Sequence, residues 1–288
     1  MRFSNSFAVY VFAALVPFLA SASEIAPQAK GEVARQREAG FNLTESAAKA
    51  ILNRYAFKPK TRNDYYVEIY DGAAFLLGTS SNEYKLRLQD YSQKSVLQTA
   101  RKLSIQTANC PGTSLNFNVR EKETGELEIP RASRDRFIQL AETQLALLRG
   151  SDGAAFLTHA QQFKTLVSAF KVPLLPALLA VPGQHPWYFV PTHITYKTKS
   201  KAEVDFGYGL VEVSVTEGED NLGQEFVQNK FEVEFEPVDS MSAGDFAASV
   251  CEFAREVGLS VGDVTPLRLK VQETTLTRLK PFNGALGL

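Results

Sequence analysis

The sequence predicts an α+β fold built on antiparallel strands, with helices between groups of strands. Six or seven segments alternate apolar residues with charged or amide residues, the period of a strand that has one covered face. Longer segments carry apolar residues at helical spacing behind Ser, Thr or Asn caps. An open sheet covered by helices on one face fits this alternation, and so does a closed β-barrel with a polar lumen.

Composition limits the class of protein. The chain has 288 residues, 44% of them hydrophobic, which is enough for one large domain or two small ones. The formal net charge of −1 argues against a general nucleic-acid binder, which should be clearly basic. G-x-S-x-G, P-loop and H-E-x-x-H motifs are missing from the sequence, and its three histidines do not suggest a catalytic triad.

The N-terminus has the pattern of a secretory signal peptide. Arg2 precedes an apolar run from Phe7 to Leu19, and residues 20–22, Ala-Ser-Ala, supply a small-residue cleavage site. An uncleaved membrane anchor is the alternative, but the run is short for a bilayer and Pro17 interrupts it. We therefore predict a signal peptide over residues 1–22, cleavage before Ser23 and a secreted or extracytoplasmic mature protein.

Two cysteines remain in the mature chain, Cys110 and Cys251. Export favours their oxidation to a disulfide. A buried free thiol is equally natural for Cys251, which shares a predicted helix with Ala247, Val250 and Ala254. Asn42 begins an Asn-Leu-Thr sequon, which has meaning only in a eukaryotic host.

The first half of the chain predicts one helix and then strands. Asn42 or Thr44 can cap a helix that the polar stretch KPKTRND ends at residues 58–64. Alternation predicts strands over 65–71, 83–91, 95–106 and 114–122, the third less distinctly than the others. ETGE at 123–126 predicts a turn, with ELEIP at 126–130 as the hairpin partner of the preceding strand.

Helices occupy the middle of the chain and strands return after it. The first helix is predicted from a Ser133 cap to Gly150, and the second over 153–171 with His159 at its surface or half-buried. Further elements are a strand at 193–201, a hairpin with arms 202–209 and 210–218, a strand at 230–237, a helix from Ser242 to Gly258, and a last strand at 266–276.

Charge is sorted by strand. Cations share one face of several strands: Lys85 and Arg87; Arg120 and Lys122; Lys197, Lys199 and Lys201. Anions share one face of others: Glu212; Glu232, Glu234 and Glu236. These faces are ordinary solvated surface if the sheet is open. They converge if a barrel closes, where grouped carboxylates suit Mg²⁺ or Mn²⁺ and grouped Lys and Arg suit polyphosphate.

The order of motifs resembles the CYTH domains, or triphosphate tunnel metalloenzymes. YVEIYDGAAFLLG carries Glu68 and Asp71 at the acidic places of that family's first stretch. YKLRLQ is similar to its arginine strand, NFNVREK to a basic strand, and YKTKSKAEVDFGYGLVEVSV to its basic strand and hairpin. KFEVEFEPVDSMSAGDFAASVCEFAREVG is the best match, to the late glutamate strand and the helix that follows it. The resemblance covers roughly residues 36–275.

This resemblance implies an antiparallel β-barrel of about eight strands with helices packed outside. It implies one domain over residues 36–280, between a polar lead-in at 23–35 and a tail at 281–288. Carried over by position, Glu38, Glu232 and Glu234 would hold Mg²⁺ or Mn²⁺. The phosphate-side cations would be Lys85, Arg87, Arg120, Lys122 and Lys199.

The first motif departs from the family. Its E-x-E-x-K places fall on Gln36, Glu38 and Gly40, so one acid and the lysine are missing. Two functions therefore follow. One is a secreted divalent-metal-dependent phosphohydrolase acting on a triphosphate or polyphosphate, for which no catalytic residue is assigned. The other is a non-catalytic secreted barrel that binds an anionic ligand or a partner, with a phosphorylated or other anionic small molecule as the expected ligand.

Overall fold

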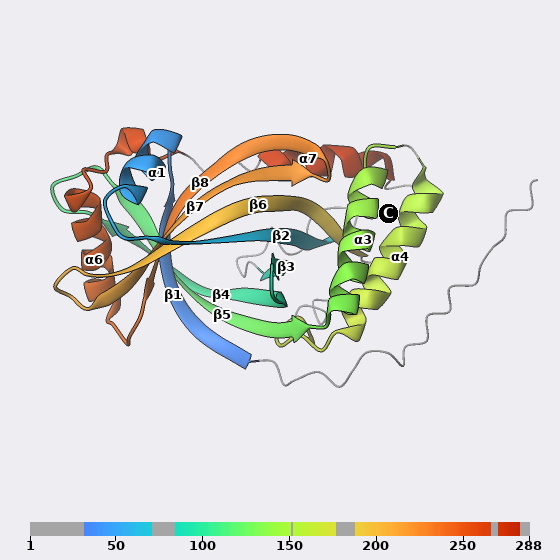
Figure 1. The fold of residues 1–288 in the computed structure, drawn as a ribbon, viewed down its shortest axis with the longest axis horizontal. Helices are drawn as coiled ribbons and strands as arrows, with labels where there is room; N and C mark the ends of the chain where they lie inside the picture. The colour runs from blue at the N-terminus through green and yellow to red at the C-terminus, as the bar shows by residue number, and fades with distance from the viewer. Residues whose placement is uncertain (1–31, 71–83, 151, 177–187, 266–269, 283–288) are drawn as a thin grey trace, which may run out of the picture.

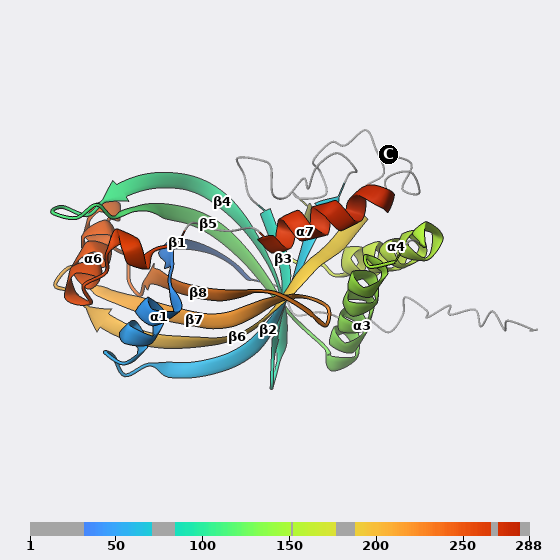
Figure 2. The same cartoon turned by 90° about the horizontal axis from the view of Figure 1, so that it is seen from above.

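Eight antiparallel strands close into one barrel (Figures 1 and 2). The computed structural model describes residues 32–70, 84–150, 152–176, 188–265 and 270–282, so the predicted signal peptide lies outside the described residues. The strands are β1 Glu32–Asn42, β2 Lys58–Tyr70, β3 Tyr84–Tyr91, β4 Ser95–Asn109, β5 Asn116–Ile129, β6 Tyr188–Asp205, β7 Leu210–Leu222 and β8 Glu225–Pro237. Their order around the barrel is β1-β5-β4-β3-β2-β6-β7-β8 and back to β1. Of the two architectures that fit the alternation, the closed barrel is confirmed.

Helices cover the two ends of the barrel, as Figure 1 shows. Helices α1 (Glu45–Leu52) and α6 (Ala243–Glu256) lie at one end, and α3 (Arg131–Leu147) and α4 (Gly153–Ala169) at the other; α7 (Lys270–Leu279) packs on β6, β7 and β8. No helix among the described residues is long and apolar enough to cross a bilayer.

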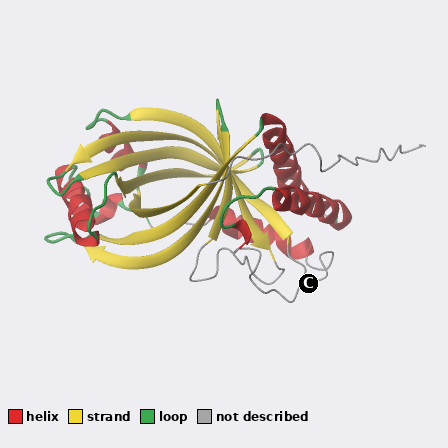
Figure 3. Cartoon of the chain, turned by 90° about the horizontal axis from the view of Figure 1, so that it is seen from below, coloured by secondary structure: helices red, strands yellow, loops and turns green. Residues whose placement is uncertain are grey.

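The hydrophobic cores lie outside the barrel, between the strands and the helices whose places around it Figure 3 shows. One core joins Val67, Leu88 and other outward residues of β2 and β3 to α3, α4 and α7. The second joins Val233 and Phe235 of β8 to Phe253 of α6 and to α1. Because alternate strand residues point to opposite faces, burying the apolar set outside turns the polar set into the lumen.

The barrel is closed unevenly because β3 is short. β3 pairs with Arg62–Val67 of β2 and with Ser95–Arg101 of β4. The first residues of β2, Lys58–Thr61, pair only with β6, and Ser104–Asn109 of β4 pair only with β5. Among the described residues, β2 thus has an unpaired edge beyond the tip of the β3–β4 hairpin, and β4 has one beyond the start of β3.

Local signals set several boundaries correctly. Thr44 accepts from the Ala47 N–H at the start of α1, and Ser242 caps α6 through the Asp245 N–H. The Ser133 cap is wrong, because α3 begins at Arg131 behind Pro130, whose fixed φ suits the transition from β5 into a helix.

His159 is half-buried on α4, as expected. Asn42 ends β1 opposite Glu232, inside the sheet rather than in a surface loop.

Three secondary-structure predictions need correction. The stretch 58–64, predicted only to end a helix, belongs to β2 because it pairs with β6, and β1 begins at Glu32, within the predicted polar lead-in. The predicted strand 266–276 is wrong where it is described, since α7 buries Val271, Thr275 and Leu279 at helical spacing. The turn at 123–126 is wrong too: β5 runs unbroken to Ile129.

Gly125 sits in the middle of β5 because another chain segment approaches it closely. A Cβ added there would lie 2.6 Å from the Pro173 carbonyl oxygen and 2.7 Å from its Cβ. We expect Gly125→Ala to lower the free energy of unfolding by about 1–3 kcal/mol through this overlap. Urea denaturation measures it, with Gly244→Ala as the control, because its nearest new contact is 3.8 Å. Equal stability of the two variants would contradict the close approach.

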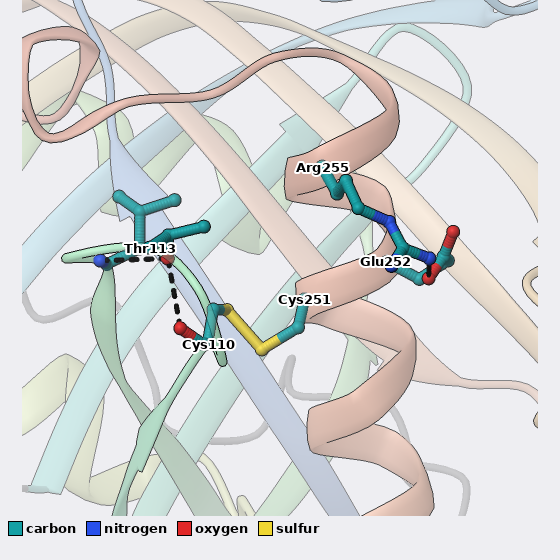
Figure 4. The surroundings of a disulfide bond; sticks show 6 residues. Cys110, Thr113, Cys251, Glu252 and Arg255 are labelled. Carbon is teal, nitrogen blue, oxygen red and sulfur yellow. Dashed lines mark hydrogen bonds and ion pairs between the residues drawn. A yellow bond between two sulfur atoms is a disulfide. The ribbon is translucent and has the colours of Figure 1, made fainter.

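Cys110 and Cys251 form a disulfide with a sulfur–sulfur distance of 2.17 Å (Figure 4). Cys110 follows the last residue of β4, and Cys251 lies on α6. The bridge therefore ties the far end of the β4–β5 pair to the helix that covers β8, and the disulfide alternative is the one the structure supports.

Candidate ligand site in the barrel lumen

Polar side chains from every strand face the lumen. On β2 the outward residues Tyr65, Val67 and Ile69 are buried in the outer core, so the alternate residues Arg62, Asp64 and Tyr66 point inward. Their contacts confirm this direction, because Asp64 reaches side chains of β3 and β6 across the inner surface. The same alternation places the cations and acids of the other strands in this lumen.

Asp64 is the centre of the most densely charged part of the lumen. Its side chain is fully buried. Three cations contact it: Lys197 Nζ lies 2.6 Å from Oδ2, Arg87 Nη1 3.2 Å from Oδ2, and Arg62 Nε 2.9 Å from Oδ1. Burial alone would raise the pKa of this carboxyl, but attraction to Lys197, Arg87 and Arg62 outweighs it and holds the pKa well below its usual range.

This group, which we call the Asp64 cluster (Arg62, Asp64, Arg87 and Lys197), carries more positive than negative charge. Three cations share a single carboxylate, so two positive charges are not neutralised within the cluster. Tyr66 adds a phenol, whose oxygen lies 3.4 Å from both Asp64 Oδ2 and Arg87 Nη1. An anion entering the lumen would compensate this excess.

The acidic side of the lumen lies on β1 and β8. Gly40 of β1 pairs with Glu234 of β8, and a Cβ at Gly40 would lie 2.8 Å from the Val233 carbonyl, so glycine permits this approach. Lys199 reaches across from β6 and binds Glu234 at 2.7 Å. Attraction to Lys199 holds the pKa of Glu234 well below its usual range.

The other two predicted metal ligands are also paired with lysines. Glu38 binds Lys122 of β5, and Glu232 binds Lys230 at 3.1 Å. No group of three or more His, Cys, Asp or Glu side chains gathers within the described residues. Acid–lysine pairs of this kind do not fit a divalent metal site as they stand, because ammonium groups hold the carboxylates. The metal roles of Glu38, Glu232 and Glu234 stay predictions.

The predicted phosphate-side cations separate into two kinds. Arg87 belongs to the Asp64 cluster, while Lys122 and Lys199 pair with glutamates. Lys85, on the same face of β3 as Arg87, and Arg120, on the lumen face of β5, have no ion pair with the described residues. Arg120 Nε is also buried without a hydrogen-bond partner. These two cations are therefore available to a ligand, although their binding role stays a prediction.

Sequence reasoning missed three members of this site: Arg62, Asp64 and Lys230. The signal was present, because Lys58, Lys60, Arg62 and Asp64 continue the inward alternation of β2 by two-residue steps. A run of polar residues conceals it, since both faces of this part of β2 are hydrophilic. Lys197 was recognised as part of a basic face, but its contact with Asp64 was not.

His193 lies on β6 inside the lumen and stacks on Tyr66, with ring centroids 4.4 Å apart. Thr192 Oγ1 lies 3.0 Å from its Nδ1, and Asp220, Lys230, Asp64 and Lys197 are the charged groups that act on it. Burial lowers the pKa of His193 to about 4, so the ring is neutral at pH 7.

A pH dependence of stability follows from His193. The unfolded chain takes up a proton near pH 6.5, whereas the folded chain does so only near pH 4. The contribution of His193 to the free energy of unfolding should therefore be fully present above pH 6.5. It should fall by up to about 3 kcal/mol as the pH drops to 4. Urea denaturation at pH 7 and pH 4.5 measures this loss, which His193→Phe should largely remove while keeping a ring against Tyr66. An equal loss in both proteins would contradict it.

Comparisons with solved structures find chains of similar fold at low sequence identity. No protein-family model matches the chain, and no curated protein sequence does. The putative adenylyl cyclase HpAC1 from Hippeastrum, described as having a dominant triphosphatase activity, aligns with a TM-score of 0.45 at 13% identity, over 78% of this chain and 88% of its own.

Two further solved structures are similar. PH1819 from Pyrococcus horikoshii OT3 aligns with a TM-score of 0.38 at 13% identity, over 85% of this chain and 99% of its own. The Pct1 RNA triphosphatase of S. pombe, solved with the Spt5 CTD, aligns at 0.32 and 11% identity, over 90% of this chain and 87% of its own. Because these scores lie below 0.5, the activities of those proteins do not decide the ligand of this lumen.

Proposed function

We propose that the barrel binds a phosphorylated ligand of the triphosphate or polyphosphate class in its lumen. The Asp64 cluster carries this proposal, because three cations converge on one buried carboxylate and leave positive charge uncompensated. Arginine guanidinium groups suit phosphate oxygens, which they bind through two parallel hydrogen bonds. The side chains of Arg87 and Lys230 in the lumen are 21% and 23% exposed, so water and small anions can reach them.

Lys85 and Arg120 give the sharpest test of binding, because they have no ion pair to lose. We expect Lys85→Gln/Arg120→Gln to weaken tripolyphosphate binding by about tenfold or more for each charged contact that is lost. The variant should keep the urea midpoint of unfolding of the wild-type protein. Isothermal titration calorimetry measures the affinity. The control is Arg136→Gln/Lys280→Gln, which removes the same charge from exposed positions away from the lumen. Wild-type affinity in the lumen variant would contradict the proposal.

Hydrolysis of the bound ligand is the second candidate function. Glu38, Glu232 and Glu234 favour it, because they lie on neighbouring strands and face the same lumen as the cations, although each would have to leave its lysine before it could hold a metal ion. Phosphate release from tripolyphosphate and ATP should be measured with Mg²⁺ or Mn²⁺ and after chelation with EDTA. Release that Glu232→Gln/Glu234→Gln abolishes would support a metal-dependent phosphohydrolase. Release no greater than in that variant leaves the protein a binding barrel.

We also propose that the protein works outside the cytoplasm. The signal-peptide pattern supports export, and the Cys110–Cys251 disulfide suits an oxidising compartment. N-terminal sequencing of the protein from a secretion-competent host should begin at Ser23. Recovery of the full-length chain from the cytoplasm alone would contradict export.

A further inference from the structure

A second basic site lies at the edge of the lumen, at the tip of the β3–β4 hairpin, where Lys60 and Arg62 of the inward face of β2 meet the hairpin turn and the start of α3. An open groove of about 860 Å³ is bounded by the start of β2, by the hairpin turn and by the junction between β5 and α3. Its charged lining residues are Lys60, Arg62, Lys94, Arg131 and Arg134 against Asp90 and Glu128. The groove lies where β3 ends, beside the part of β2 that pairs only with β6.

The acids of the groove neutralise only part of this charge. Asp90 is held by Arg134 through two hydrogen bonds of 2.8 and 2.6 Å and accepts a third from Ser95 at 2.7 Å. Arg62 is engaged by Asp64 in the lumen. Lys60, Lys94 and Arg131, in contrast, have no ion pair with the described residues, and all three are exposed to solvent. Glu128 has no ion pair with them either, so three unpaired cations face one unpaired acid on the walls of the groove.

The remaining walls also suit an anion. Lys60 Nζ lies 4.3 Å from the centre of the Tyr91 ring, which holds this ammonium group at the edge of the groove. At the start of α3, Pro130 provides no side-chain cap and the first turn contains no acidic residue. Positive charge in this groove thus comes from three different elements, β2, the β3–β4 turn and α3.

We propose that this groove binds the phosphate or sulfate groups of a multivalent anion, as a site centred on Lys94 and Arg131 and not on the Asp64 cluster. Lys94 and Arg131 are its main contacts, Lys60 adds a third cation from β2, and the Arg134–Asp90 pair ties the start of α3 to the end of β3. Phosphate and sulfate share the tetrahedral oxyanion that such cations recognise. The proposal does not depend on the proposed function of the lumen.

Calorimetric titration of the full mature chain tests this second site. To separate the sites, the background is Lys85→Gln/Arg120→Gln, in which lumen binding is weakened. Tripolyphosphate and sucrose octasulfate serve as the phosphate and sulfate probes. We expect binding of at least one probe to fall by about tenfold or more when Lys94→Gln/Arg131→Gln is added, and to be unchanged when Arg136→Gln/Lys280→Gln is added.

The probe that responds identifies the ligand chemistry. Loss with tripolyphosphate alone assigns a phosphorylated ligand, loss with sucrose octasulfate alone a sulfated one, and loss with both a general oxyanion site. Failure of the groove variant to weaken either probe beyond the charge-matched control overturns the proposal. A thermal unfolding midpoint equal to that of the background confirms that the exposed substitutions leave the fold intact.

Discussion

Asp64→Asn is expected to lower the free energy of unfolding by about 3–5 kcal/mol. Asparagine keeps the shape of the side chain but removes its charge, so Arg62, Arg87 and Lys197 lose their shared counter-ion at a fully buried position. Removing one partner from a buried ionic group costs this much because the remaining charges are left uncompensated. Urea denaturation at pH 7 measures the loss.

A matched control is available in the same lumen. Asp220 is also buried, but it accepts hydrogen bonds from the neutral side chains of Thr195 and Gln228. Asp220→Asn should therefore cost less than Asp64→Asn. The lowered pKa of Asp64 also means that its contribution is present above pH 4 and is lost as the pH falls further, because the unfolded carboxyl protonates first.

The same variant tests whether the cluster responds to anions. Tripolyphosphate should raise the urea midpoint of Asp64→Asn more than that of the wild type, since the ligand supplies the missing negative charge. Asp220→Asn should show the wild-type increase. Equal stability of the two variants, or an equal ligand response in all three proteins, would contradict the role assigned to the Asp64 cluster.

Loss of the disulfide should produce the second large effect. Cys110 and Cys251 are separated by 141 residues, so their bond closes a long loop and restricts the conformations of the unfolded chain. Such bridges typically contribute about 2–5 kcal/mol. We expect Cys110→Ala/Cys251→Ala to lower the free energy of unfolding by that amount, as measured by urea denaturation.

Reduction separates the bond from the packing of the two side chains. Wild-type protein treated with dithiothreitol should unfold near the urea midpoint of the double alanine variant. The variant itself should not respond to dithiothreitol. If reduced wild-type protein, with both thiols confirmed by titration, kept the midpoint of the oxidised protein, the bridge would contribute nothing to stability.

Much of the barrel was predictable because strand alternation is a local property. Phe231, Val233 and Phe235 form one face of β8 and Glu232, Glu234 and Glu236 the other, so the sequence itself indicates a strand with one covered face. The closure of the barrel was not predictable from this pattern. A polar face toward solvent and a polar face toward a lumen have the same sequence.

The composition of the site was less predictable for a related reason. A single aspartate after a basic stretch looks like surface, and nothing local shows that Asp64 is buried among cations from β2, β3 and β6. Partner choice depends on how strands lie around the closed barrel. Lys199 of β6 reaches past β7 to Glu234 of β8, and Lys122 binds Glu38 although its register partner is Gln36. The sequence also predicts a turn around Gly125 and not a strand, because the approach of Pro173 that requires glycine there is a long-range contact.

The central claim is that the lumen is an anion-binding site. A crystal structure of the protein grown with tripolyphosphate tests it most directly. We predict phosphate oxygens in the lumen within hydrogen-bond distance of Arg120 or Lys85, beside the Asp64 cluster. A lumen without bound anion at saturating tripolyphosphate, with Lys85 and Arg120 unchanged, would contradict the claim.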